Sequence, residues 1–120
     1  MGEHDEQFHL STVTVAEIEQ GIAQLLRRNE EGTVRRAEAL ESWLQDTIRR
    51  FGVRLLVLGT AEALATGALS DKAYSEGAHP GFPDVAIAAT AQVHDLTVLT
   101  RNLKHFIALE VACLDPFNLD

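Results

Sequence analysis

The most constraining feature of this 120-residue chain is its alternation of two patterns. Short runs of apolar, β-branched residues alternate with longer segments in which apolar residues recur every three or four positions. The runs are typical of buried strands, and the periodic segments are typical of helices. Strands separated by helices pair in parallel, with helices on both faces of the sheet. We therefore predict a single α/β domain over residues 1–120.

The boundaries of the expected elements follow from the same patterns. Strands are predicted at residues 8–14, 53–58, 96–100 and 109–114, and helices at residues 15–29, 33–50, 61–75 and 83–94. Gly32 is expected to separate the first two helices. Pro83 is expected in the first turn of the last helix, where its missing N–H has no cost.

Composition excludes several classes of protein. The chain is 46% apolar and 23% charged, as in ordinary globular domains, and no apolar run is long enough to span a membrane. The acidic start, MGEHDEQFHL, lacks the basic and apolar regions of a signal peptide. The lone cysteine, Cys113, cannot form a disulfide within the chain, so we expect a reducing, cytoplasmic location.

The formal net charge of −8 argues against broad electrostatic binding of nucleic acid. Basic residues nevertheless occur in small groups, among them Arg101 with Lys104. These groups are either solvated helix surface or a local strip that contacts nucleic acid.

Three polar residues are expected at one edge of the sheet. Glu17 follows the first strand, Asp84 opens a helix, and Asn102 follows the strand at 96–100. Function collects at the carboxyl ends of parallel strands, where the helices also begin. Oxygen ligands gathered there suit Mg²⁺ or Mn²⁺.

Each of these residues also has a structural explanation. Residues 14–17 match a capping box that ends in Glu17. Asp84 is favoured by the helix dipole, and Asn102 is a common turn residue. The histidines at positions 79, 94 and 105 are scattered over a loop, a helix end and a turn.

Three segments carry a resemblance to a known family: LSTVTVAEIEQGI, PDVAIAATAQVHDLTVLTRN and VACLDPFN. In order and spacing they resemble the VapC- and FitB-type toxins of the PIN-domain family, from about Phe8 to Asn118. The resemblance implies an α/β/α sandwich whose acidic pocket binds Mg²⁺ or Mn²⁺ and hydrolyses RNA. It also implies an antitoxin partner that binds operator DNA, and a role in plasmid stability.

The site residues carry over position by position. Glu17 and Asp84 match the second and third acidic metal ligands of the family. Asn102 matches a fourth position that is Asp or Asn, and Thr100 matches a hydroxyl residue beside the pocket.

One part of the family pattern is absent from the front of this chain. Family members begin with a central strand that ends in Asp-Thr-Asn, whereas only nine residues precede Leu10 here. We therefore expect a fold truncated at that strand, with activity weakened or lost. The alternatives are a non-catalytic module that keeps the antitoxin-binding surface, and a start downstream of the natural one. Unpaired edges at 8–14 and 96–100 predict a homo-oligomer.

Overall fold

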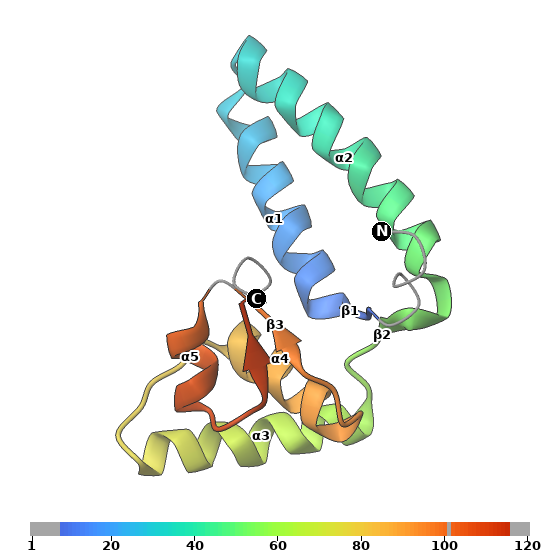
Figure 1. Ribbon diagram of the computed structural model, residues 1–120. Helices are drawn as coiled ribbons and strands as arrows, with labels where there is room; N and C mark the ends of the chain where they lie inside the picture. The colour runs from blue at the N-terminus through green and yellow to red at the C-terminus, as the bar shows by residue number, and fades with distance from the viewer. Residues whose placement is uncertain (1–7, 101, 116–120) are drawn as a thin grey trace. The chain divides into compact units, whose positions relative to one another are not determined.

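The computed structural model describes residues 8–100 and 102–115 of the chain (Figure 1). It divides into two compact units, Met1–Val57 and Leu58–Asp120, and each is described by itself. Among the described residues, each unit has a pair of parallel strands with helix between them along the chain, which confirms the predicted α/β class with parallel pairing. The predicted single domain stays a prediction.

Unit 1 is a helical hairpin that closes on a short strand pair. Its elements are β1 (Leu10–Ser11), α1 (Thr12–Arg28), α2 (Glu31–Phe51), a 3₁₀ turn (Gly52–Arg54) and β2 (Leu55–Leu56). Leu10 and Leu55 are register partners in the parallel pair.

The first strand ends much earlier than the sequence pattern suggested. The Ser11 hydroxyl accepts a hydrogen bond from the Val13 N–H at 3.0 Å and caps α1. The strand predicted over residues 8–14 is therefore wrong beyond Ser11, because the cap starts a helix at Thr12.

The turn between α1 and α2 also differs from the prediction. Asn29 adopts the left-handed conformation (φ 53°) and ends α1. Gly32 lies inside the first turn of α2, so it does not break the helix. The Thr33 hydroxyl accepts the Glu30 N–H at 3.1 Å, which satisfies a free donor at the start of α2.

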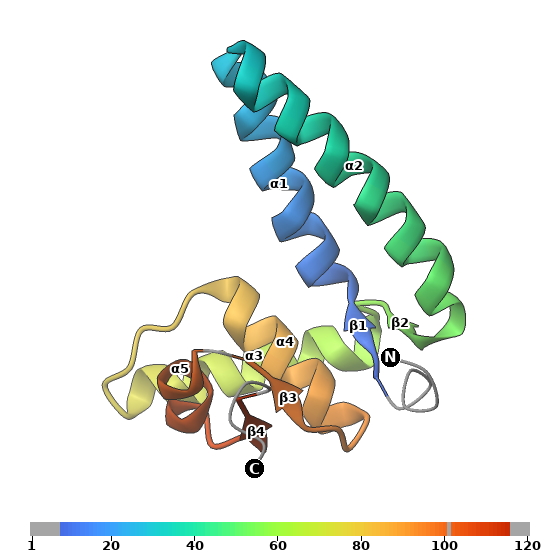
Figure 2. The same ribbon diagram turned by 45° about the horizontal axis from the view of Figure 1, so that its top comes forward.

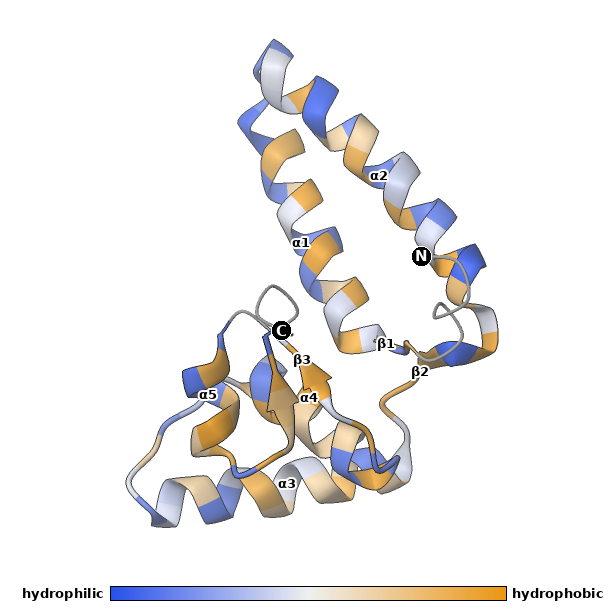
Figure 3. Cartoon of the chain, viewed as in Figure 1, coloured by the Kyte–Doolittle hydropathy of each residue, from blue (hydrophilic) through white to orange (hydrophobic). Residues whose placement is uncertain are grey.

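The hairpin is held together by its apolar inner face. Ile22 of α1 and Ala37 and Leu44 of α2 are fully buried, and partly buried aliphatic residues flank them. Figure 3 shows the apolar residues of both helices alternating with polar ones, as expected for helices with one buried face.

Unit 2 contains three helices and the second strand pair. Its elements are α3 (Thr60–Ser75), α4 (Phe82–Val93), β3 (Val98–Leu99), α5 (Leu103–Ala108) and β4 (Cys113–Leu114). Strands β3 and β4 are parallel, and α5 is the crossover between them. The strands are shorter than the predicted 96–100 and 109–114, and α5 was not predicted.

Helix α4 is the centre of unit 2. It is rich in alanine, and Val85, Ala86, Ala88 and Ala89 are almost completely buried. Small side chains let α3 approach closely, and the two helices lie side by side (Figures 1 and 2). Pro83 lies in the first turn of α4, as predicted.

Candidate functional site

The candidate site lies in unit 2, at the start of α4. Asp84 occupies the first turn of this helix, and its carboxylate oxygen Oδ2 lies 2.9 Å from Nδ1 of His105 on α5. The Asp84 side chain is 29% exposed, so it is accessible to solvent although it is held in place. The contact therefore leaves a partly exposed carboxylate in a defined position.

Two further predicted residues follow β3 directly. The Asn102 N–H donates to the Thr100 hydroxyl at 2.9 Å, and Asn102 is the residue that precedes α5. Helix α5 begins just after the carboxyl end of β3, the strand end at which functional residues are expected. His105 of α5 contacts Asp84 there. Asp84 thus lies near this strand end.

Of the two predicted basic residues, Lys104 lies within the described part of the chain. Lys104 lies on α5 and is exposed to solvent. Arg101 lies outside the described residues.

Glu17 lies in unit 1, on the second turn of α1, and is exposed. The capping-box interpretation of Glu17 is wrong, because Ser11 rather than Thr14 caps this helix. The assignment of Glu17 and Asp84 to one metal site stays a prediction.

The predicted site residues of unit 2 carry groups that suit a hard, oxygen-preferring cation. Asp84 offers a carboxylate, and Thr100 and Asn102, which follow β3, offer a hydroxyl and an amide oxygen. Within residues 8–100 and 102–115, no three His, Cys, Asp or Glu side chains gather in a position to hold a metal ion. Such a set does not suit structural zinc, but it suits Mg²⁺ or Mn²⁺, which takes one or two carboxylates and completes its shell with water and phosphate.

Sequence reasoning missed His105. Its position relative to Asp84 depends on α5, which the sequence did not suggest because residues 103–108 follow a turn and form fewer than two turns of helix. The available signal was the three-residue spacing from Asn102, the residue that precedes α5, to His105. This spacing puts His105 in the first turn of the helix.

A second polar pair joins the other end of α4 to α3. The Glu62 carboxylate accepts the Gly59 N–H at 3.0 Å and lies 2.8 Å from Nε2 of His94. Its side chain is only 11% exposed. The pKa of Glu62 is lowered, mainly by a hydrogen bond with its own backbone and next by the hydrogen bond with His94. These effects outweigh the burial of the carboxylate, which by itself raises the pKa. Because it is at the opposite end of α4 from Asp84, we interpret this pair as structural.

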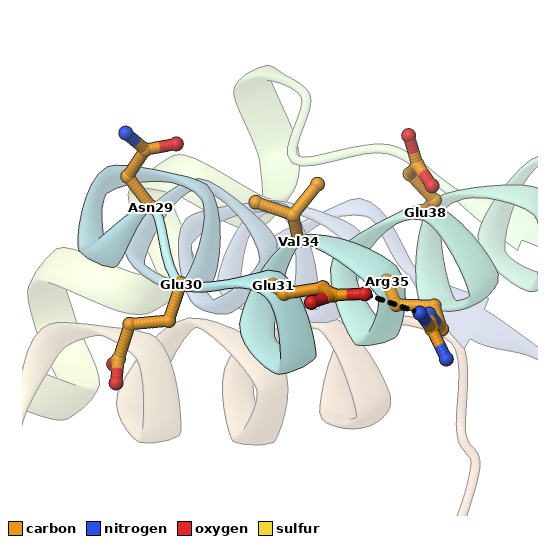
Figure 4. Close-up of a pocket in the computed structure, with 6 residues that line it drawn as sticks. All are labelled: Asn29, Glu30, Glu31, Val34, Arg35 and Glu38. Atoms are coloured by element: carbon orange, nitrogen blue, oxygen red, sulfur yellow. Dashed lines mark hydrogen bonds and ion pairs between the residues drawn. The ribbon is translucent and has the colours of Figure 1, made fainter.

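Two shallow hollows on the surface do not offer a better site. One, of about 320 Å³, lies at the tip of the hairpin of unit 1 (Figure 4). The side chains of Asn29 and Glu30 point in opposite directions there, and Arg35 pairs with Glu31 at 2.8 Å. Its carboxylates therefore do not converge on a ligand.

The other hollow, of about 390 Å³, is lined by residues of α3, by Gln92 of α4 and by Leu109 and Glu110, which follow α5. Lys72 and Glu110 form an ion pair at its rim, and the hydrogen bond to Glu110 is the main cause that raises the pKa of Lys72. The rest of the lining is alanine and leucine apart from Gln92, so the hollow offers no cluster of catalytic groups.

Comparison with known proteins agrees with the fold. Residues 2–110 match the model of the PIN domain. The chain belongs to the PIN-domain family, as the resemblance predicted.

One curated relative is Toxin FitB of Neisseria gonorrhoeae (strain ATCC 700825 / FA 1090). It is 34% identical over 113 residues, which are 94% of this chain and 78% of that protein. Among solved structures, FitAcB from Neisseria gonorrhoeae matches with a TM-score of 0.76 at 32% identity, over 92% of this chain and 76% of that one. FitAB bound to the IR36 DNA fragment matches with a TM-score of 0.75 at 33% identity, over 93% and 75%.

A more distant structure supports the fold alone. VapBC-1 from nontypeable Haemophilus influenzae matches with a TM-score of 0.57 at 22% identity, over 90% of this chain and 73% of that one. Among the helices of the described residues, none combines the length and the apolar character that crossing a membrane requires.

Proposed function

We propose that this protein is a ribonuclease toxin of a toxin–antitoxin pair, dependent on Mg²⁺ or Mn²⁺ and active in the cytoplasm. The observation that carries the proposal is the partly exposed Asp84 carboxylate at the start of α4, in contact with His105. Membership of the PIN-domain family and the 34% sequence identity with Toxin FitB support the proposal.

In this proposal Asp84 and Asn102 would hold the metal, and Glu17 stays the further predicted ligand. When bound, a divalent ion polarises a phosphate and makes an activated water available. His105 is a positioning residue, because its ring nitrogen fixes one carboxylate oxygen of Asp84. Thr100 stabilises the Asn102 backbone through its hydroxyl.

Recognition of the substrate has a separate electrostatic part. Lys104 is exposed on α5, one residue before His105, and is suited to contact an RNA phosphate. Arg101 has the same predicted role. On an acidic chain these two charges supply a local attraction rather than a broad one.

The partner in this proposal is an antitoxin. The matched solved relatives include FitAcB and FitAB bound to a DNA fragment, which supports a protein partner and control at operator DNA. We expect a basic side chain of the antitoxin to enter the acidic site, since a guanidinium pairs well with carboxylates.

The test is Asp84→Asn in the full chain. We expect metal-dependent cleavage of a labelled single-stranded RNA to fall by roughly a hundredfold or more, because an amide is a poor substitute for a charged metal ligand. Asp71→Asn is the matched control: Asp71 is an exposed aspartate on α3 of the same unit, and we expect full activity. Undiminished cleavage by Asp84→Asn, with chelator-sensitive activity in the wild type, would refute the assignment.

The second candidate is a non-catalytic interaction module with the same fold. It is favoured by the lack, among the described residues, of a cluster of three metal-binding side chains. Calorimetric titration of Mg²⁺ and a cleavage assay on the same sample separate the two. Antitoxin binding without metal binding or cleavage would support the module.

A further inference from the structure

The loop that leads into the site carries exposed aromatic rings. Tyr74 near the end of α3 is 67% exposed, and Phe82 at the start of α4 is 61% exposed. His79 lies between them on the connecting loop and is also exposed. Single exposed apolar residues are common, but this group borders one loop, which ends at Gly81, three positions before Asp84.

The rings are held on defined backbone positions. Tyr74 and His79 meet edge to face, with ring centroids 5.1 Å apart and planes at 78°. Phe82 is the first residue of α4 and is followed by Pro83, which restricts the backbone conformation of Phe82. The connecting loop runs along the side of unit 2 where α5 lies (Figures 1 and 2). Rings presented in this way lose little conformational entropy when a planar ligand binds.

The negative net charge of the chain makes exposed aromatic rings a useful way to bind RNA. With a formal net charge of −8, the chain gains little from long-range attraction to phosphates. Stacking of bases on aromatic rings needs no net positive charge and tolerates any base sequence. Unpaired bases are also the parts of RNA that proteins reach most readily.

We propose that Phe82, together with the edge-to-face pair of Tyr74 and His79, provides the aromatic rings on which bases of a single-stranded RNA stack while its backbone passes Asp84. This inference rests on the proposed ribonuclease function and deepens it: affinity for the substrate comes mainly from stacking, and the few basic residues position the backbone. Phe82 lies in the first turn of α4, two positions before Asp84, and it is therefore the ring chosen for the test.

The experiment measures binding without cleavage. The full chain carrying Asp84→Asn is titrated into a labelled single-stranded RNA of about ten nucleotides, and fluorescence anisotropy reports the dissociation constant. Adding Phe82→Leu keeps the apolar bulk and removes the aromatic face, whereas Phe82→Trp keeps it. Ile107→Ala is the matched control, since Ile107 on α5 is as exposed as Phe82 (61%) but aliphatic.

We expect Phe82→Leu to weaken binding by roughly fivefold to a hundredfold and Phe82→Trp and Ile107→Ala to change it by less than about twofold. The salt dependence should stay the same in Phe82→Leu, because no phosphate contact is removed. An RNA of the same length with abasic sites should bind to the Asp84→Asn protein that keeps Phe82 as weakly as normal RNA binds to the protein that also carries Phe82→Leu.

Three outcomes would overturn the inference: equal affinity for abasic and normal RNA, no loss in Phe82→Leu, or no RNA binding at all. A loss of antitoxin binding in Phe82→Leu with unchanged RNA binding would assign the rings to a protein partner instead, and would overturn it as well. Failure of the proposed ribonuclease function shows separately, as cleavage by the wild type that does not depend on Asp84.

Discussion

Replacing Phe106 by alanine tests whether the core of unit 2 keeps His105 in place. Phe106 is the buried residue of α5, only 4% exposed, and it packs into the cluster that includes Val85 and Leu109. A helix of six residues is not stable by itself, so packing must hold α5 against the rest of the unit. Burying a phenylalanine removes about 150–250 Å² from water, and Phe→Ala in a core costs about 3–5 kcal/mol.

That loss is a large part of the stability of an ordinary domain, about 5–15 kcal/mol. Urea unfolding followed by far-UV circular dichroism measures the change in the free energy of unfolding, and the NMR signals of the His105 ring report its contact with Asp84. Ile107→Ala on the same helix is the control, with an expected change within about 0.5 kcal/mol because Ile107 is 61% exposed. Equal destabilisation by the two variants, or an unchanged His105 signal in Phe106→Ala, would refute the reasoning.

Three further predictions concern titration and assembly. Because the pKa of Glu62 is lowered in the folded state, its contribution to stability is present above the ordinary value of 4.5 and is lost as the pH falls through the folded pKa. Glu62→Gln should therefore lower the urea midpoint of unfolding at neutral pH. The difference in midpoint from the wild type should shrink below pH 4.5, and a difference that grows in acid would contradict this prediction. The pKa of Glu19 is raised, mainly by its hydrogen bond with Glu41, so Glu41→Gln should raise the urea midpoint at neutral pH and less so in acid. A gain that is independent of pH would count against that explanation. We also expect sedimentation to show a homo-oligomer, and a clean monomer at working concentration would exclude it.

The sequence determined those features that depend on neighbours along the chain. The apolar spacing that brings Ile22 and Leu44 into the hairpin core is a local, 3.6-residue pattern, and it located both helices to within a few residues. Pro83 and Asp84 in the first turn of α4 follow from the missing N–H of proline and from the helix dipole. The PIN-domain family was also recognisable from short motifs in their order, since each motif combines several such local preferences.

Tertiary structure decided what depends on distant partners. The contact of Asp84 with His105 joins residues 21 positions apart, and that of Glu62 with His94 joins residues 32 apart. Neither leaves a periodic trace in the sequence, because a hydrogen bond between two side chains needs only one residue on each segment. The short strands and α5 belong to the same class. Their two or six residues are too few for propensity to decide, so the pairing of β1 with β2 and of β3 with β4 limits the strands, and the burial of Phe106 holds α5.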